Sequence, residues 1–497
     1  MNNADSTRPK PRIPRGLRDL FATDVVARRK MIETILAVYE RYGFEPLETP
    51  AIEYVDVLGK YLPESDTPEG GIFSLRDDDS QWIALRYDLT APLSRVFAQY
   101  GSELTAPYRR YQVGPVWRQE KPGPGRFREF YQCDFDTVGT ASMAADAEVC
   151  AVMASSFDAL GIERGDYLIK VNNRKVLSGV LDAIGLPEGG DGGAGSRLTV
   201  LRAIDKLDRV GPEGVLQLLG DGRRDESGDF TPGAGLRAEQ AATVMAYVQA
   251  GDDDRAEVCR RLRELVGESP VGAAGVRELE DIHRFLEATD LGSDQVIFDP
   301  SVVRGLAYYT GPVFEAVLTF EVEEEGERRQ FGSVIGGGRY DDLVERFTGE
   351  VIPATGASIG VDRLLAALKA LGRLEAVGVG RPVVVTVFDR ENMTEYQRMV
   401  AELHSDGIAA ELYLGEGGFR AQLKYADKRN APVVVIAGSD EFSRGEVTLK
   451  DMKLGAELAK KIGDREEWAK GQPAQISVPR GELVEATRRL LDRQTRT

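Results

Sequence analysis

The chain has 497 residues, of which 42% are hydrophobic and 29% are charged, and its formal net charge is −18. This length exceeds what one hydrophobic core supports, so about two to four globular domains are expected, and no apolar stretch approaches the roughly 20 residues of a membrane helix. The negative charge argues against nonspecific nucleic-acid binding, and any RNA site must therefore be a local basic patch.

The N-terminal region predicts one helix and one short strand. Residues 1 to 10 contain no apolar core of a secretion signal, so a cytoplasmic location is expected. Apolar residues recur at helical spacing from Asp24 to Tyr42, with Asp24 able to cap the start and Gly43 to end the helix. The run from Gly43 to Pro50 alternates and ends in proline, which is typical of an edge or interface strand.

The next elements in the chain predict a hairpin and then an insertion. Residues 108–117 and 129–138 are two strand-like runs that flank a Pro/Gly loop, which predicts a long hairpin. Residues 172–296 are mostly helical in pattern, with a glycine-rich break at 188–195. We interpret them as a helical insertion into one catalytic domain, formed by residues 1–171 and 297–378.

Strand-like runs return after the insertion, at residues 311–323 and 330–335, and a strand-to-helix passage follows at 357–371. Between them, Gly336-Gly337-Gly338 could form either a tight turn or a binding loop. From residue 381 to 497, short apolar strands alternate with helical segments, which predicts a separate α/β domain.

The second hairpin strand has a polar face. With a period of two, Phe130, Gln132, Asp134 and Asp136 share one face. Two interpretations are open: a half-exposed strand with its polar side in water, or a floor of acceptors beneath a polar ligand.

Cations are concentrated on the same hairpin. They border the Pro/Gly loop, as expected of a phosphate clamp in which guanidinium groups pair with oxyanions, although surface arginines also occur on ordinary solvated faces. The cluster consists of Arg109, Arg110, Arg118, Lys121, Arg126 and Arg128. No Gly-x-x-x-x-Gly-Lys-Ser/Thr run is present, which argues against a P-loop nucleotidase.

Two scarce residue types limit the possible chemistry. The chain has two histidines, His283 and His404, so carboxylates, arginines and tyrosines must carry any catalysis. Cys133, Cys150 and Cys259 lie too far apart in sequence for a zinc knuckle or a disulfide framework. They are expected to be reduced and buried, and no tightly bound protein metal is expected.

Several of these runs together resemble class II aminoacyl-tRNA synthetases and, among them, the histidyl-tRNA synthetase family. The helix from Asp24 and the strand to Pro50 resemble motif 1, residues 116–130 resemble motif 2, and residues 360–365 resemble motif 3. The run Arg304-Gly305-Leu306-Ala307-Tyr308-Tyr309 resembles the histidine-specific signature of that family, and residues 337–341 its second histidine motif.

The resemblance implies a fold, a reaction and partners. The fold would be α+β: an antiparallel sheet flanked by helices, with a helical insertion and a C-terminal α/β anticodon-binding domain. ATP with Mg²⁺ would activate L-histidine, and the histidyl group would pass to tRNA(His). Motif 1 builds a dimer interface in this class, so a homodimer is implied.

The resemblance also implies residue roles, assigned here to the matching positions. Catalysis would rest on Arg118, Arg304 and Gln132. ATP would be held by Arg118, Glu120, Arg126, Phe130 and Arg363, with Phe130 and Arg363 on either side of the adenine. Histidine would be held by Asp88, Leu89, Thr90, Arg118, Gln132, Asp136, Arg304, Tyr308, Tyr309 and Tyr340. The tRNA would be bound by Lys121, Gly123, Arg420, Lys424, Lys428 and Arg429.

Two positions depart from the family pattern. Ala307 stands where an aspartate is usual, and Gly123 stands where many bacterial members carry a polar residue that reads the extra nucleotide of the tRNA. Two rival interpretations remain: a regulatory paralogue of the same fold that binds a partner enzyme, and a class II synthetase for another amino acid. The lysines near Tyr425 also fit an ordinary solvated helix face.

Overall fold

The computed structural model describes residues 9–59, 61–62, 67–68, 71–122, 126–186, 197–224, 228–303, 309–324, 327–330, 332–372, 381–461 and 474–495. The chain divides into two compact units, Met1–Ala376 and Val377–Thr497. Each unit has its own hydrophobic core.

The first unit is built on an eight-stranded sheet that is antiparallel except at its two edges, where β1 pairs with β7 and β12 pairs with β9 in parallel. In spatial order its strands are β1 (Glu45–Pro46), β7 (Tyr108–Trp117), β8 (Glu129–Val138), β17 (Ala354–Gly360), β16 (Ser333–Arg339), β13 (Pro312–Leu318), β9 (Tyr167–Asn173) and β12 (Val296–Phe298).

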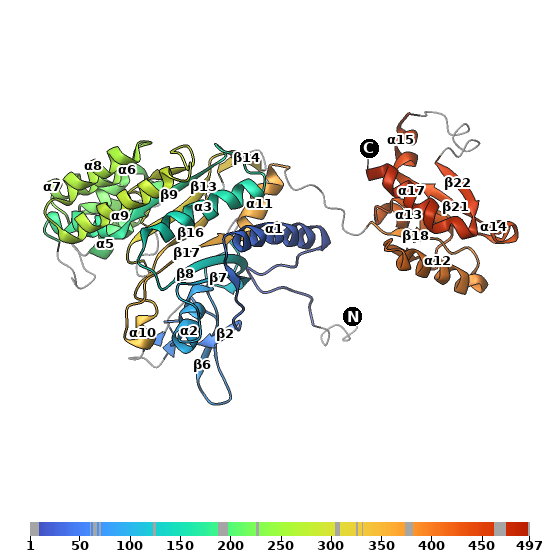
Figure 1. Ribbon diagram of the computed structural model, residues 1–497, viewed down its shortest axis with the longest axis horizontal. Helices are drawn as coiled ribbons and strands as arrows, with labels where there is room; N and C mark the ends of the chain where they lie inside the picture. The colour runs from blue at the N-terminus through green and yellow to red at the C-terminus, as the bar shows by residue number, and fades with distance from the viewer. Residues whose placement is uncertain are drawn as a thin grey trace. The chain divides into compact units, whose positions relative to one another are not determined.

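Three helices pack on one face of this sheet: α1 (Ala22–Arg41), α3 (Met143–Ala159) and α11 (Val361–Ala370) (Figure 1). The strand residues beneath them are apolar, among them Cys133 and Phe135, and they join the helices in one core. Burial of this face leaves the opposite, polar face of the sheet available for a site.

The expected N-terminal helix is confirmed, with a difference at its start. Helix α1 begins at Ala22, and the Asp24 carboxylate pairs with Lys369 instead of capping the helix. At the other end Gly43 has φ +78°, a left-handed conformation that glycine adopts without the strain of a side chain.

Helices follow the β9 strand and gather at that end of the sheet, beside β9 and β12 (Figure 1). They are α4 (Arg174–Ala183), α5 (Arg197–Ile204), α6 (Leu207–Leu219), α7 (Ala238–Val248), α8 (Arg255–Val266) and α9 (Pro270–Glu287). A hairpin of β10 (Gly222–Arg224) and β11 (Phe230–Pro232) follows α6. Val176, Leu262 and Leu279 lie in the same core as the sheet, so these helices are packed onto it.

The remaining elements of this unit are small. They are β2 (Ile52–Tyr54), β3 (Tyr61–Leu62), β4 (Thr67–Pro68), β5 (Ser74–Arg76), β6 (Trp82–Leu85), α2 (Thr90–Tyr100), α10 (Glu345–Thr348) and the hairpin of β14 (Glu321–Glu324) and β15 (Glu327–Gln330), whose β14 strand contacts α11. The loop between β6 and α2 reaches the polar face, because Arg110 of β7 donates to the Leu89 carbonyl.

The second unit contains a five-stranded sheet of β19 (Ala410–Leu412), β18 (Val383–Val385), β20 (Val433–Ile436), β21 (Glu446–Asp451) and β22 (Gln475–Pro479). Its α-helices are α12 (Met393–Ser405), α13 (Phe419–Lys428), α14 (Ser439–Arg444), α15 (Met452–Lys461) and α17 (Leu483–Thr495). The three predicted strands are parallel neighbours, whereas β21 and β22 add antiparallel strands that the sequence pattern did not predict.

Candidate active site

The register of the central strands brings polar residues together on the face of the sheet opposite helices α1, α3 and α11. Across β7 and β8, Arg110 pairs with Asp136, and across β8 and β17, Ser358 pairs with Asp134 and Gly360 with Gln132. Residues directly opposite each other share a face, so these side chains form one surface, which we call the polar floor. Gln132, Asp134 and Asp136 are buried, so the interpretation of a strand face open to water is wrong.

Glycines leave space for neighbouring side chains in part of the polar floor. The triple glycine lies within β16 and forms neither a turn nor a loop. A Cβ on Gly338 would come within 2.7 Å of the Tyr309 ring, and one on Gly356 would come within 2.2 Å of an Asp136 carboxylate oxygen. The absence of side chains at these two positions therefore lets Tyr309 and Asp136 occupy their places.

The Asp136 carboxylate is held from two sides. Arg110 pairs with its Oδ2 at 2.8 Å, and the Tyr340 hydroxyl donates to its Oδ1. Burial raises the pKa of Asp136, while Arg110 and Tyr340 act in the opposite direction by stabilising the charged form. Tyr340, expected among the residues that bind histidine, is itself 2% exposed and acts on Asp136.

A chain of hydrogen bonds links the middle of the polar floor. Gln132 Nε2 donates to the Ser358 hydroxyl, which in turn bonds to the Asp134 carboxylate. Burial raises the pKa of Asp134 to about 7, and the positive charge of Arg110 limits the rise. Gln132 Oε1 and Asp134 Oδ1 have no hydrogen-bond partner among the described residues.

The loop before α2 carries three of the expected histidine-binding residues, Asp88, Leu89 and Thr90. The Asp88 carboxylate accepts the Ala91 amide at 2.9 Å, which fixes its direction at the start of the helix. Partial burial raises the pKa of Asp88, opposed by that amide and by Arg118. The Leu89 side chain is fully buried, and Thr90 is the first residue of α2.

At the other end of the polar floor, Arg118 and Phe130 meet. The Arg118 guanidinium lies 5.2 Å from the centre of the Phe130 ring, and its Nε donates to the Tyr87 carbonyl at 3.0 Å. This arrangement joins a fixed cation to an aromatic surface, which suits a phosphate next to a stacked base. Both residues lie at the mouth of the hairpin loop.

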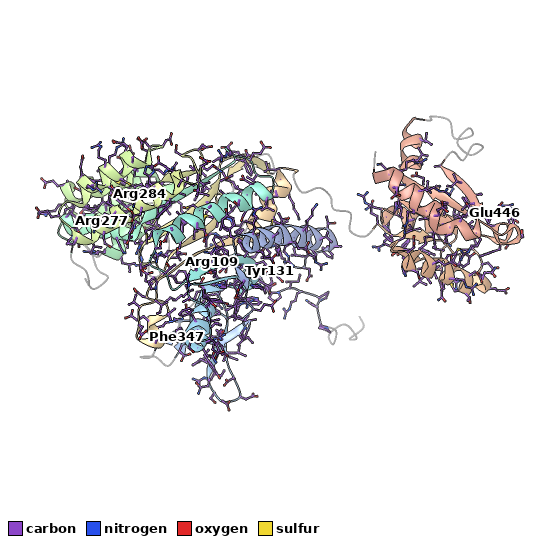
Figure 2. The ribbon with its side chains drawn as sticks, in the orientation of Figure 1. Arg109, Tyr131, Arg277, Arg284, Phe347 and Glu446 are labelled. Atoms are coloured by element: carbon purple, nitrogen blue, oxygen red, sulfur yellow. The ribbon has the colours of Figure 1, made fainter. Side chains whose placement is uncertain are left out.

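The predicted cation cluster of the hairpin separates into two groups. Arg110 is buried in the polar floor. Arg109, which is labelled in Figure 2, lies on the helix-covered side, where it pairs with Glu148 and lies over the Phe44 ring. Neither therefore belongs to a loop clamp, and that part of the prediction is wrong. Glu120, Lys121 and Arg126 are exposed beside the loop, and Gly123 lies outside the described residues.

Helix α11 is tied to the hairpin next to Arg363. The Asp362 carboxylate accepts the Tyr131 amide at 2.7 Å and a guanidinium bond from Arg18. The partly buried Arg363 follows directly. Arg304 and Tyr308 lie outside the described residues, as do the three residues between them, whereas the partly buried Tyr309 lies beside Gly338.

The C-terminal basic patch lies on α13 and at its end. Arg420, Lys424 and Lys428 are exposed, and Tyr425 packs edge-on against Tyr413 at 5.3 Å between ring centres. Arg429 forms two bonds to the Glu411 carboxylate, at 3.0 and 2.9 Å. Because Arg429 is already paired with Glu411, its guanidinium is less available to a polyanion than the exposed cations of the patch are.

The sequence analysis gives no individual role to Arg110 or Asp134, which appear only within the cation cluster and the polar strand face, and it does not identify Ser358. Folding the hairpin symmetrically about its loop would have placed Arg110 opposite Asp136, because Trp117 then faces Glu129. Ser358 belongs to a strand far away in sequence, and nothing in its local pattern indicates its partners.

An antiparallel sheet with helices on one face, whose hairpin β7–β8 carries buried polar residues on the other face, is the architecture of a class II aminoacyl-tRNA synthetase, and the family models and solved structures agree. The family model for histidyl-tRNA synthetase matches residues 16–364, and that for an anticodon binding domain matches residues 382–486. The chain belongs to the histidyl-tRNA synthetase family.

Individual relatives agree with this assignment. The chain is 58% identical over 490 residues to histidine--tRNA ligase of Cereibacter sphaeroides, covering 98% of this chain and 99% of that one. It is 56% identical to histidine--tRNA ligase of Paracoccus denitrificans, with coverage of 97% and 98%. The crystal structure of histidyl-tRNA synthetase from Nostoc sp. PCC 7120 matches with a TM-score of 0.71 and 29% identity, over 97% of this chain and 100% of that chain.

Two further observations concern the described residues alone. None of their helices combines the length and hydrophobicity needed to cross a bilayer. Within the same ranges, no three histidine, cysteine, aspartate or glutamate side chains form a group that could hold a metal ion.

Proposed function

We propose that the chain is a histidine--tRNA ligase, which activates L-histidine with ATP to histidyl-adenylate and transfers the histidyl group to the 3′ end of tRNA(His). The observation that carries this proposal is the buried group of Asp136, Arg110 and Tyr340 at one end of the polar floor, with Arg118 and Phe130 at the other. One end suits a polar heterocycle, and the other suits a nucleotide phosphate and base.

The ATP end is assigned to Arg118, Glu120, Arg126, Phe130 and Arg363. Arg118 holds the α-phosphate, Glu120 helps to place the base, and Phe130 and Arg363 enclose the adenine. The contact between Arg118 and Phe130 supports this assignment, because it puts phosphate and base recognition side by side. Mg²⁺ arrives on the phosphates of ATP and neutralises part of their charge.

The amino-acid end is assigned to the loop 88–90, Gln132 and Asp136. Asp88, Leu89, Thr90 and Gln132 hold the α-ammonium end, while Asp136 reads the imidazole together with Tyr308 and Tyr309. The Tyr340 hydroxyl donates to Asp136 Oδ1, and Oδ2 forms an ion pair with Arg110 but has no hydrogen-bond partner among the described residues, so an imidazole N–H can be accepted there.

The chemistry then proceeds in two displacements. A carboxylate oxygen of histidine attacks the α-phosphorus of ATP, and pyrophosphate leaves. A hydroxyl of the terminal ribose of the tRNA next attacks the carbonyl carbon of the adenylate, its proton is released, and AMP leaves. Arg118, Arg304 and Gln132 stabilise the negative charge that develops around the α-phosphate.

Binding of tRNA is assigned to both units. Lys121 and Gly123 belong to the hairpin loop beside the active site, and Arg420, Lys424, Lys428 and Arg429 belong to the C-terminal α/β domain. The match of residues 382–486 to an anticodon binding domain supports the second assignment. Within the first unit, we assign 172–296 to an insertion between two halves of the catalytic domain.

Assembly and location complete the proposal. The protein forms a homodimer through the motif 1 region, for which the class resemblance of residues 24–50 is the support. It works in the cytoplasm, where tRNA is charged. Sedimentation of the purified chain tests the first statement, since a monomer at micromolar concentration contradicts it.

The regulatory paralogue is disfavoured by specific features. Paralogues of that kind generally lack an anticodon domain, whereas residues 382–486 match one, and the Arg118 and Phe130 pair of the nucleotide end is intact. ATP–pyrophosphate exchange with each amino acid in turn is the decisive test. We expect exchange with histidine alone, and comparable exchange with another amino acid would contradict the specificity.

A further inference from the structure

Asp134 is a buried carboxylate that the reaction described above does not use. It lies on β8 between Gln132 and Asp136, it is 1% exposed, and the Ser358 hydroxyl bonds to it. Its other oxygen, Oδ1, has no hydrogen-bond partner among the described residues. Burying a carboxylate oxygen without a hydrogen-bond partner costs free energy, so a donor is expected to bind to it in the working protein.

The neighbouring orphan atom has the same chemistry. Gln132 Oε1 is also a buried acceptor without a described partner, and it lies two residues along the same strand face. Side chains so placed are separated by roughly 7 Å along the strand, which a single small group between them can bridge. Both atoms are acceptors, so a bound donor such as an ammonium satisfies them, whereas an anion or an apolar group does not; Arg110 Nε and Nη1 are the donors of the same floor without a partner among the described residues.

Charges in this cluster are close to balance. Asp88, Asp134 and Asp136 act on one another electrostatically, and Arg110, Arg118 and Arg86 act on them with positive charge. A bound ammonium is therefore held by hydrogen bonds to particular oxygens and not by an excess of negative charge.

We propose that Asp134 is a further substrate-binding residue, whose Oδ1 accepts a hydrogen bond from the α-ammonium of histidine alongside Asp88 and Gln132, and that binding of the amino acid displaces a proton from Asp134. An ammonium has three N–H donors, and Asp134 joins Asp88, Thr90 and Gln132 as one of the oxygens that share them. This inference rests on the proposed function, because it concerns the same amino-acid pocket.

The proton displacement follows from the surroundings of Asp134. Its pKa of about 7 means that the empty site is partly protonated at neutral pH. An ammonium beside it favours the charged form and lowers this pKa, so histidine binding releases a proton and strengthens as pH rises through about 7. The titratable groups that act on Asp134 or are acted on by it come from several elements: Arg110, Asp136, Asp88, Arg86, Tyr340, Tyr39 and Cys133.

The test compares the full-length enzyme with Asp134→Asn in ATP–pyrophosphate exchange, from about pH 6 to about pH 9, so that the range spans the pKa of Asp134. We expect the KM for histidine to rise about tenfold or more at the alkaline end, because a bond to a charged group is lost. The KM for ATP should stay within about twofold. The pH dependence of histidine KM should flatten relative to wild type.

Asp146→Asn is the matched control. Asp146 is also fully buried in the first unit, and burial raises its pKa, but its carboxylate is bonded to Arg339 and Thr355. This control should lose stability while keeping the histidine KM and its pH profile. Thermal melting of each variant separates loss of folding from loss of substrate binding.

A second measurement uses the unmodified chain and so does not depend on a variant that folds. Calorimetric titration of histidine near pH 7, in two buffers of different ionisation enthalpy, counts the protons released, and wild type should release more than Asp134→Asn. Equal proton release together with an unchanged histidine KM would overturn the inference and leave the orphan oxygen to a buried water. Absence of exchange with histidine in wild type would instead contradict the proposed function.

Discussion

Gly356→Ala tests whether the polar floor determines how histidine is read. A Cβ at this position would lie 2.2 Å from Asp136 Oδ1 and 2.4 Å from the Phe135 carbonyl oxygen. Ordinary contacts of these atoms need roughly 1 Å more, and the strand backbone on both sides is fixed by pairing with β8 and β16. The carboxylate must therefore move, and it loses its place beside the Tyr340 hydroxyl.

The expected magnitude follows from the interactions that are lost. Asp136 would forfeit a hydrogen bond to a charged group, worth about 1.5 to 3 kcal/mol, which corresponds to roughly a 10- to 100-fold rise in the KM for histidine. Overpacking should also lower the free energy of unfolding by about 1 to 3 kcal/mol. The KM for ATP should stay near wild type, because Arg118 and Phe130 lie at the other end of the floor.

Exchange kinetics with varied histidine and varied ATP measure both effects, and urea unfolding measures the loss of stability. Gly337→Ala is the matched control, because its Cβ would strike the Gly356 carbonyl and Ala357 on the helix-covered face. It should lower stability without a selective rise in histidine KM. A Gly356→Ala enzyme with wild-type histidine KM would refute the role assigned to this glycine and to Asp136.

The remaining predictions concern single sites and one truncation. Tyr340→Phe should raise the histidine KM about tenfold in exchange assays, because Asp136 loses a hydroxyl donor, and an unchanged KM would argue against the pairing. Burial raises the pKa of Asp134 to about 7, so the stability gained from its neutral form is present in acid and is lost as pH rises through about 7. In urea unfolding near pH 8, Asp134→Asn should therefore be more stable than wild type by on the order of 2 kcal/mol. Near pH 4 the two proteins should be equally stable. A chain ending at Ala376 should keep pyrophosphate exchange and lose most tRNA charging, and full charging would contradict the role of the second unit. Arg304→Ala should lower kcat for adenylate formation by roughly 10²-fold with little change in ATP affinity, and near-wild-type single-turnover rates would return this arginine to a structural role.

The hairpin shows which features of the fold the period-two sequence pattern predicts by itself. Strands at 108–117 and 129–138 were predicted from alternation, and the structure has β7 and β8 at these residues. The polar face of β8 was also confirmed, since Gln132, Asp134 and Asp136 lie together. Periodicity states which side chains share a face, but whether water or another part of the chain covers that face depends on distant segments.

The triple glycine and the arginine pair show where local reasoning fails. Glycine runs commonly mark turns, yet here all three glycines lie within β16, and at Gly338 the Tyr309 ring occupies the space that a side chain would need. Adjacent arginines on a strand point to opposite faces, so Arg109 and Arg110 could never have acted as one clamp. The two strands of the C-terminal sheet that the sequence pattern did not predict, β21 and β22, begin at Glu446 and Gln475.

The sheet order has a consequence for the synthesis of the protein on the ribosome. The β8 strand carries the acceptors of the polar floor, and its neighbour β17 is made only after all the insertion helices and the β13–β16 pair have been translated. Until then one edge of β8 lacks its native partner, while the insertion helices, with their local contacts, can fold early. A nascent chain stalled within the insertion therefore presents an unpaired strand edge whose carboxylates are buried in the folded protein. At this stage of translation, a chaperone that shields strand edges would have its largest effect on aggregation.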